Sequence, residues 1–382
     1  MATSPPTSIM MVDLKAQYRA MQEEVDNAVL DVIRSGAFIN GPATKAFQAG
    51  LENFLRCQHV IPCANGTDAL QIAMMALELE PGDEVIVPAF TYVATAEVIA
   101  LLHLKPVMVD VDPRTFNVTA DLIEPAITER TKAIVPVHLF GQSCDMAPIL
   151  ALAQKHQLFV VEDNAQSVGA EYTLPTGETA RTGTIGDIGC TSFYPSKNLG
   201  AYGDAGAINT DNEVLASKLR MVANHGQKRR YYHDIVGCNS RLDSIQAAIL
   251  NCKLKRLDNY NTNRRSAADY YDQALAEVPS LLTPLRQANS THVFHQYTLR
   301  VTDGRRDELK TYLQERGVPS MIYYPVPLYA QEAYKGAAAN QVDFLPVTDQ
   351  LCKEVISLPM HSELDEETLA YITKTLLAFW QG

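Results

Sequence analysis

Short apolar runs alternate with helical patterns between about residues 60 and 210. Runs rich in Val and Ile predict strands at Glu84–Phe90, Pro106–Asp110, Lys132–Val137 and Leu158–Asp163, and helical patterns lie between them near 92–103, 119–128 and 145–156. Near-continuous apolar strands separated by helices predict a parallel sheet that is covered on both faces. Ligands of such sheets bind at the carboxyl ends of the strands, so we expect functional residues directly after these runs.

The pattern changes after residue 243. The stretch from Asp243 to Gln273 predicts one or two long helices that lead away from the sheet. Beyond about residue 276, a strand-like segment at His295–Val301 mixes with helical segments at Arg306–Arg316 and Glu366–Phe379. A chain of 382 residues is long for a single core. We therefore expect a disordered tail at residues 1–10, a large α/β domain at 11–250 and a small α+β domain at 251–382.

Composition excludes several classes of protein. A net charge of −12 argues against a dedicated nucleic-acid binder, which would usually carry a basic face. No apolar run approaches the roughly 20 residues of a membrane helix, and the N-terminus has no basic segment typical of a signal peptide. The seven cysteines are odd in number and form no C-x-x-C pair, so a disulfide framework or a zinc ribbon is not expected. We expect a cytoplasmic protein without a metal site.

The segment Cys63–Asp68 (CANGTD) precedes a helical pattern at 69–79. Free backbone N–H groups and the helix dipole make such a helix start an anion site. Gly66 would allow a ligand to approach closely, and Thr67 could add a hydroxyl donor. The same residues would also suit an ordinary helix cap by Asn65 or Thr67.

The apolar run that ends at Asp163 continues as Asn-Ala-Gln166. A carboxylate at the end of a strand could hold a pyridinium N–H and keep a cofactor ring protonated, so that the ring withdraws electrons. The alternative is a carboxylate that caps the next turn. A metal-ligand role for Glu162 or Asp163 has less support, because no matching cluster of His or Asp follows.

A lysine, Lys197, follows a strand-like segment and precedes the glycine-rich stretch up to Gly206. A buried lysine amine loses its proton more easily and becomes a nucleophile. Ser192, in the same segment, could donate a hydrogen bond to a phosphate. Tyr92, which follows another strand, could stack on a flat cofactor. The alternatives are a surface lysine in a flexible loop and an ordinary core tyrosine.

The most basic segment of this acidic chain runs from His225 to Asp243. Arginine and lysine side chains there could bind a diphosphate or a carboxylate. A solvated basic loop is the alternative, and it is favoured more strongly for Lys228, Arg229 and Arg230 than for Arg241.

Taken together and in this order, the motifs resemble the DegT/DnrJ/EryC1/StrS family, the nucleotide-sugar aminotransferases. The resemblance runs from about Met11 to the C-terminus, and it rests on Val12–Leu14, Asn65–Thr67, Phe90–Tyr92, Glu162–Asp163 with Gln166, Ser196–Lys197, Gly203–Asp204 and Asn239–Asp243. It implies the fold type I of pyridoxal-phosphate enzymes, with a large, mostly parallel sheet domain and a smaller α+β C-terminal domain.

The resemblance also implies a role for each matching residue. Lys197 would form a Schiff base with pyridoxal 5'-phosphate and later move the proton, while Asp163 would pair with the pyridine nitrogen. The other cofactor contacts would be Gln166 at the ring hydroxyl or ring face, Tyr92 stacked on the ring, and Gly66, Thr67 and Ser192 at the phosphate. Asn239 is similar to a residue that reaches the phosphate from the neighbouring subunit, which implies a homodimer with shared active sites. Relatives that dehydrate the sugar replace the lysine by histidine, so Lys197 favours amino transfer.

The implied reaction moves an amino group, with glutamate as the expected donor, to a nucleotide-linked keto-sugar. The segments Cys63–Gln71 and His225–Asp243 most resemble enzymes that act at C3, on UDP-2-acetamido-3-keto-uronates or TDP-3-keto-6-deoxyhexoses. Arg241, Tyr323 and Tyr324 would contact the substrate. Relatives often have histidine where this chain has Tyr323, and that departure weighs against a uronate. Two alternatives are amination at C4 and a non-catalytic regulator, although no basic recognition helix for DNA is evident.

Overall fold

The structure is a computed structural model that describes residues 8–335 and 344–381. Its centre is a seven-stranded sheet in the order β1-β9-β8-β5-β4-β2-β3. The strands are β1 (His59–Cys63), β2 (Glu84–Pro88), β3 (Lys105–Val109), β4 (Thr131–Ile134), β5 (Phe159–Asp163), β8 (Ile188–Ser192) and β9 (Gly206–Thr210). Five neighbouring strands from β8 to β3 pair in parallel, and β9 runs antiparallel to both of its neighbours. The predicted strands and the mostly parallel sheet are thereby confirmed.

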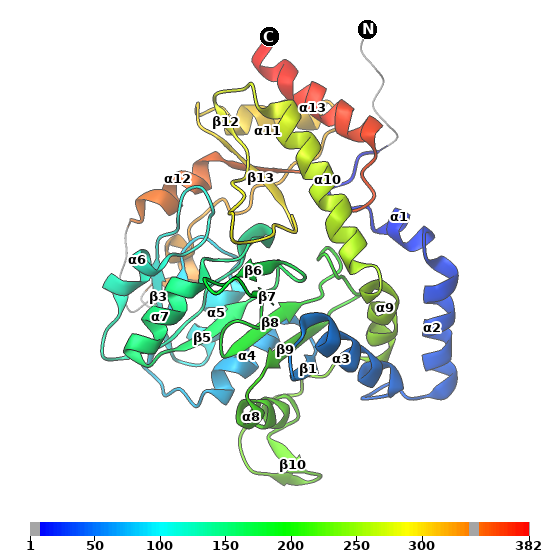
Figure 1. The fold of residues 1–382 in the computed structure, drawn as a ribbon, viewed down its shortest axis with the longest axis vertical. Helices are drawn as coiled ribbons and strands as arrows, with labels where there is room; N and C mark the ends of the chain where they lie inside the picture. The colour runs from blue at the N-terminus through cyan, green and yellow to red at the C-terminus, as the bar shows by residue number, and fades with distance from the viewer. Residues whose placement is uncertain (1–7, 336–343, 382) are drawn as a thin grey trace.

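Helices cover both faces of this sheet (Figure 1). Because side chains alternate along a strand, Val85 and Val87 of β2 join one hydrophobic cluster and Ile86 joins the other. The first cluster includes α4 (Gly66–Ala76), α5 (Ala94–Leu101) and α8 (Glu213–Ala223), and the second includes α6 (Ala120–Ile123) and α7 (Met146–His156). The helix expected at 119–128 is shorter, because Pro125 has no N–H to continue it and a 3-10 turn (Glu124–Ala126) follows α6.

A second, three-stranded antiparallel sheet forms from β12 (Leu281–Leu282), β13 (Tyr297–Val301) and β14 (Val355–Leu358). It packs with α10 (Leu257–Leu275), α11 (Arg306–Glu315) and α13 (Glu366–Gln381) around a third hydrophobic cluster. The segment expected to form one or two long helices forms two, α9 (Ser244–Leu254) and α10. The boundary expected at residue 250 falls inside α9, and the division into domains stays a prediction.

The N-terminal helices α1 (Leu14–Arg19), α2 (Gln22–Ser35) and α3 (Pro42–Leu55) follow one another along the chain, and α2 and α3 pack against α9. The remaining helix is α12 (Pro346–Glu354). Residues 1–7 of the expected tail lie outside the described residues, while Met11 accepts a backbone hydrogen bond from Met360. Within residues 8–335 and 344–381, no helix is long and apolar enough to span a membrane.

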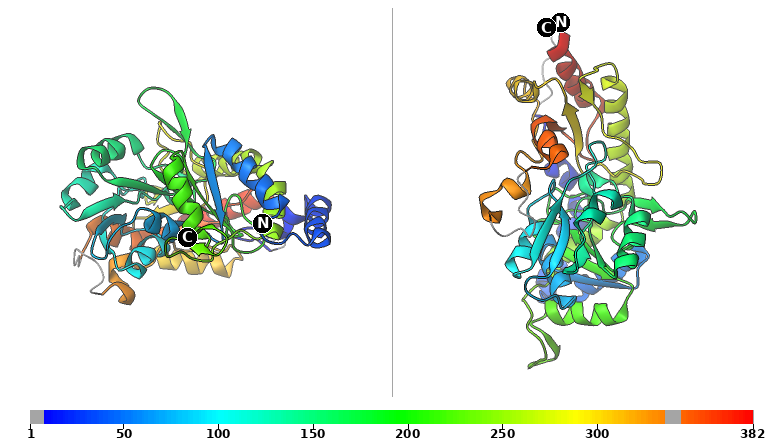
Figure 2. Two further views of the ribbon diagram at one scale, coloured as in Figure 1. Left: turned by 90° about the horizontal axis from the view of Figure 1, so that it is seen from below. Right: turned by 90° about the vertical axis from the view of Figure 1, so that its left-hand side faces the viewer.

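Two short hairpins extend from the main sheet domain. They are β6–β7 (Glu171–Thr173 and Thr179–Arg181) and β10–β11 (Gln227–Arg229 and Tyr232–His233). The second hairpin carries the basic segment, and it projects beyond α8 at the lower end of the molecule (Figures 1 and 2).

Candidate active site

A cavity of about 870 Å³ opens at the carboxyl ends of the parallel strands. Its walls come from the segments that follow β1, β2, β5 and β8, and from two stretches of the C-terminal part of the chain. Of the residues that the sequence predicts for the site, nine line this cavity: Gly66, Thr67, Tyr92, Asp163, Gln166, Ser192, Lys197, Tyr323 and Tyr324.

Lys197 and Asp163 are the two charged groups at the base of the cavity. Burial lowers the pKa of the Lys197 amine from 10.5 to about 8, and the Asp163 carboxylate partly opposes that shift. Asp163, at the end of β5, is buried, and one of its oxygens accepts a hydrogen bond from the Thr95 hydroxyl at 2.8 Å. Its other oxygen accepts one from the Ala165 N–H at 3.1 Å. A carboxylate has about four acceptor positions, so both oxygens keep capacity for a further donor.

The start of α4 lies beside the end of β8 and the beginning of β9. Asn65 caps the helix, because its side-chain oxygen accepts the Asp68 N–H at 2.8 Å. The first-turn amides of Gly66 and Thr67 are among those that no helix carbonyl can pair. A Cβ atom at Gly66 would lie 2.6 Å from Cβ of Ser192, so only glycine lets these two segments approach this closely. The helix cap and the anion site proposed from the sequence are therefore compatible.

Aromatic side chains line the opposite part of the cavity. Tyr92 is 56% exposed, and its ring centroid lies 6.3 Å from that of Tyr324. Gln166 connects two walls: its side-chain oxygen accepts the Phe140 N–H at 2.7 Å, and its side-chain nitrogen donates to the Tyr324 hydroxyl at 3.1 Å. Burial raises the pKa of the Tyr324 hydroxyl, which therefore keeps its proton as a further donor. Tyr323 lies beside it, and its hydroxyl has no hydrogen-bond partner among residues 8–335 and 344–381.

Several residues of the site were not predicted from the sequence. Thr95 donates a hydrogen bond to Asp163, and it lies in α5, the helix that follows β2, so its position after a strand was an available signal. His295 and Gln296 line the cavity but come from a segment far along the chain. Burial and the nearby cations Lys197 and Arg264 hold the pKa of His295 well below its usual range, so the imidazole is neutral. No local pattern would have located these two residues at the site.

Asn239 and Arg241 are absent from the cavity lining of the single chain, as are Lys228, Arg229 and Arg230 of the projecting hairpin. Asn239 is exposed, and its backbone forms an isolated bridge with Asn224. Their predicted roles in binding cofactor or substrate stay predictions. Among the described residues, no group of three His, Cys, Asp or Glu side chains could hold a metal ion.

Comparison with known proteins gives consistent matches along nearly the whole chain. The model of the DegT/DnrJ/EryC1/StrS aminotransferase family matches residues 19–377. A UDP-2-acetamido-2-deoxy-3-oxo-D-glucuronate aminotransferase of Pseudomonas aeruginosa is 45% identical, over 96% of this chain and 99% of its own length. A UDP-N-acetyl-3-dehydro-alpha-D-glucosamine 3-aminotransferase of Acidithiobacillus ferrooxidans is also 45% identical, over 97% of both chains. A pleiotropic regulatory protein of Geobacillus stearothermophilus is 43% identical, over 98% of this chain and 99% of its own length.

Solved structures agree with these matches. The crystal structure of NtdA from Bacillus subtilis, with bound pyridoxamine phosphate, superposes with a TM-score of 0.89 at 31% identity, over 100% of this chain and 86% of that one. Aminotransferases of this family use pyridoxal phosphate. The cavity fits that cofactor, since it combines an amine of lowered pKa, a buried carboxylate and a helix start whose glycine leaves room for a phosphate. This chain belongs to the DegT/DnrJ/EryC1/StrS aminotransferase family and is an enzyme of the transaminase class.

Proposed function

We propose that this aminotransferase moves the amino group of glutamate to C3 of a nucleotide-linked 3-keto-sugar, with pyridoxal phosphate held in the cavity around Lys197. The observation that carries the proposal is the convergence of Lys197, Asp163 and the start of α4 on one cavity. Bound there, pyridoxal phosphate supplies the chemistry that withdraws electrons from the reacting carbon. The side chains of this chain supply binding, orientation and proton transfer.

Each cavity residue has a proposed task. The amides of Gly66 and Thr67 and the hydroxyl of Ser192 bind the phosphate, because they offer donors near the positive end of the α4 dipole. Asp163, held by Thr95, keeps a proton on the ring nitrogen. Tyr92 lies against the ring face, and Gln166 donates to the ring oxygen.

Lys197 moves the proton between the carbon atoms of the reacting system. An amine with a pKa of about 8 is partly neutral near neutral pH, so it can accept a proton and return it. General acid–base catalysis of this kind contributes roughly 10²–10⁴-fold. Lys197→Ala should therefore abolish turnover, while Lys197→Arg should retain the charge but lose an amine that can become neutral and accept a proton.

A homodimer would supply the basic residues that this cavity lacks. Among the described lining residues, Lys197 is the one lysine or arginine, whereas Asp68, Asp163 and Asp204 are acidic. A nucleotide diphosphate needs cations. We propose that Asn239 of a second copy reaches the cofactor phosphate, and that Arg241 of the same segment contacts the substrate. Gel filtration of the purified protein would support this assignment with a dimer, and a monomer with full activity would contradict it.

The proposal of a C3 substrate draws on the two relatives at 45% identity, whose names specify 3-oxo and 3-dehydro sugars. UDP-2-acetamido-3-keto sugars, including the uronates, and TDP-3-keto-6-deoxyhexoses are the proposed substrates. Tyr323 and Tyr324 give the sugar an aromatic wall that has no formal charge, so a uronate carboxylate would find hydroxyl donors there but no cation. Tyr92 exposes enough of its ring to meet the sugar as well as the cofactor.

The test is incubation of the holoenzyme with glutamate and a panel of UDP- and TDP-linked 3-keto and 4-keto sugars, followed by mass spectrometry. The unstable 3-keto sugars would be generated in the same vessel by a sugar dehydrogenase or isomerase. Amination of a 3-keto sugar, lost in Lys197→Ala, is the expected result. Amination of 4-keto sugars alone would overturn the C3 assignment and leave the C4 alternative.

A further inference from the structure

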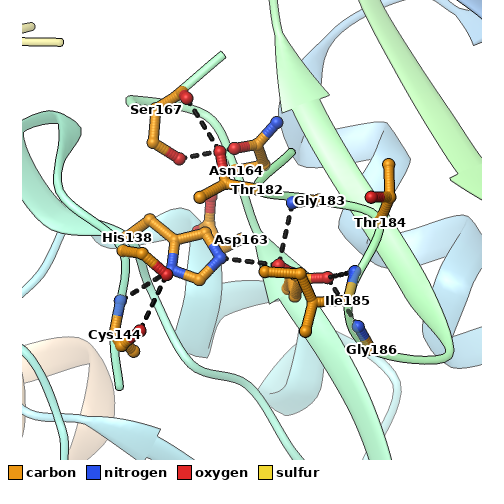
Figure 3. A network of polar contacts seen from close by, with 12 residues as sticks. His138, Cys144, Asp163, Asn164, Ser167, Thr182, Gly183, Thr184, Ile185 and Gly186 are labelled. Atoms are coloured by element: carbon orange, nitrogen blue, oxygen red, sulfur yellow. Dashed lines mark hydrogen bonds and ion pairs between the residues drawn. The ribbon is translucent and has the colours of Figure 1, made fainter. Parts of the chain in front are cut away.

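A fully buried pair, His138 and Glu162, adjoins the end of β5 that carries Asp163 and has no task in the proposed function (Figure 3). Both side chains have 0% exposure, and Nε2 of His138 lies 2.7 Å from Oε2 of Glu162. Glu162 precedes Asp163 in β5, and His138 begins the turn that follows β4. Buried charged and polar groups are costly unless they are fully hydrogen-bonded, so the partners of this pair indicate what it holds in place.

The contacts of His138 define its protonation. Its Nδ1 lies 3.1 Å from the backbone nitrogen of Cys144, and a backbone N–H can only donate. Nδ1 therefore carries the lone pair, and the proton is on Nε2, where it is donated to Glu162. The ring is a neutral tautomer with both nitrogens used, which fixes its orientation.

The carboxylate of Glu162 is also fully hydrogen-bonded. Its Oε1 accepts the N–H groups of Ile185 and Gly186 at 2.6 and 2.7 Å, and its Oε2 accepts the N–H of Gly183 at 2.8 Å besides that of His138. Four donors occupy the four acceptor positions of an ionised carboxylate. The loop at 183–186 and the His138 turn are thus tied to the strand that ends in Asp163.

The turn at 138–141 orients the side chain of Gln166. The His138 N–H donates to the carbonyl of Asp163 at 3.1 Å, and Phe140, two residues later, adopts a φ of 58°. In that conformation, the Phe140 N–H donates to Gln166 at 2.7 Å. Since an N–H needs an acceptor, the contacted atom is the amide oxygen. The amide nitrogen of Gln166 then faces the other way, with one hydrogen for Tyr324 and one that remains for a ligand in the cavity.

We propose that His138 and Glu162 are positioning residues for amino transfer: they fix the turn at 138–141 so that Gln166 presents a hydrogen-bond donor to the cofactor ring oxygen. The proposal rests on the proposed function, because it assumes that the cofactor ring lies beside Gln166. Asn117 also supports the turn, since its side-chain oxygen accepts the Leu139 N–H at 3.0 Å. Among the described residues, His138 is the one residue of the turn that contacts the Glu162 carboxylate.

The experiment compares His138→Phe, His138→Gln and Glu162→Gln as holoenzymes. His138→Phe keeps a buried ring but loses both hydrogen bonds, and we expect kcat to fall roughly 10- to 100-fold, as misplacement of a reacting group by about 1 Å does. The pH dependence of the bound cofactor's absorbance should change at the same time. His138→Gln keeps a donor for Glu162 and should recover part of both. Glu162→Gln should behave like His138→Phe, because the amide places donors against donors and Cys144 prevents the other His138 tautomer.

A matched control separates positioning from loss of stability. Ile149→Ala removes a buried side chain from α7 in the same hydrophobic cluster as Phe140. It should lower the thermal midpoint without changing the absorbance profile. If Ile149→Ala and His138→Phe lower the midpoint alike and also change kcat and the profile alike, the effect is structural only and the proposal is overturned.

The decisive comparison is a double-mutant cycle with Gln166→Met, which keeps the length of the side chain but removes its hydrogen bonds. If His138 acts through Gln166, His138→Phe should change kcat and the absorbance profile by less than about twofold in the Gln166→Met background. Independent, multiplicative effects would overturn the proposal. A Gln166→Met enzyme identical to the wild type would overturn it as well, while continued amino transfer by the wild type would leave the proposed function intact.

Discussion

The buried amine of Lys197 should lower the stability of the protein when no cofactor is bound. Its pKa falls from 10.5 to about 8 on folding. Between these values the unfolded chain binds more protons than the native chain, so the free energy of unfolding rises with pH across that window. Below pH 8 the full loss in the free energy of unfolding is present. At about 1.4 kcal/mol per pH unit the fall corresponds to about 3 kcal/mol. The residue as a whole is partly exposed although its amine is enclosed, so we expect solvent screening to reduce this cost to about 1–2 kcal/mol.

Lys197→Met should therefore abolish amino transfer and yet stabilise the cofactor-free protein. We expect its free energy of unfolding to exceed that of the wild type by about 1–2 kcal/mol near pH 7, with a difference that shrinks towards pH 10.5. Urea denaturation at several pH values measures both quantities. Lys45→Met is the matched control for the loss of one lysine, because Lys45 lies exposed on α3. A Lys197→Met protein that is no more stable than the wild type near pH 7, or a difference independent of pH, would refute the reasoning.

Three further predictions follow from the same contacts. Gly66→Ala places a Cβ atom 2.6 Å from Cβ of Ser192, and overpacking of about 1–3 kcal/mol should weaken cofactor binding roughly 5- to 150-fold; an unchanged dissociation constant in a fluorescence titration would contradict this. Thr95→Val leaves a buried oxygen of Asp163 without its donor and should lower kcat and shift the cofactor absorbance, whereas Thr95→Ser should not; equal spectra for all three proteins would count against it. Lys253→Met should raise the free energy of unfolding near pH 7, because the buried Lys253 amine has a pKa of about 8 and no hydrogen-bond partner among the described residues. The gain in free energy should fade as the pH approaches 10.5, and a loss of stability in urea titrations at pH 7 would disprove the prediction.

The fold was predictable from the sequence where burial left a local pattern. β2, β4 and β5 lie inside the sheet and β3 lies at its edge, and their runs of Val and Ile reflect burial on both faces. β9, by contrast, has the sequence GAINT, which has low strand propensity although all five residues are buried. Its Asn209 is tolerated there because its side chain donates to the carbonyl of Gly183. Because Gly183 is distant in sequence from Asn209, no local pattern predicts β9.

Some residues of the site could likewise be predicted from local sequence, and others could not. Lys197 and Asp163 could be predicted because Asp163 ends one strand, Lys197 follows another, and the carboxyl ends of parallel strands meet at one edge. His295 and Gln296 could not, because they reach the cavity only when the C-terminal part of the chain packs against the large sheet. The orientation of the Gln166 amide depends on the left-handed conformation of Phe140, which residue identity alone does not predict for an aromatic side chain.

The central claim is that Lys197 directs amino transfer from glutamate to C3 of a nucleotide-linked sugar. The most direct measurement follows the nitrogen itself, with ¹⁵N-glutamate, the holoenzyme and a UDP-linked 2-acetamido-3-keto sugar generated in the same vessel, and with the product analysed by NMR. We predict that ¹⁵N appears on C3 of the sugar with the wild type and that Lys197→Ala yields no labelled product. Label on another carbon, or labelled product formed by Lys197→Ala, would contradict the account.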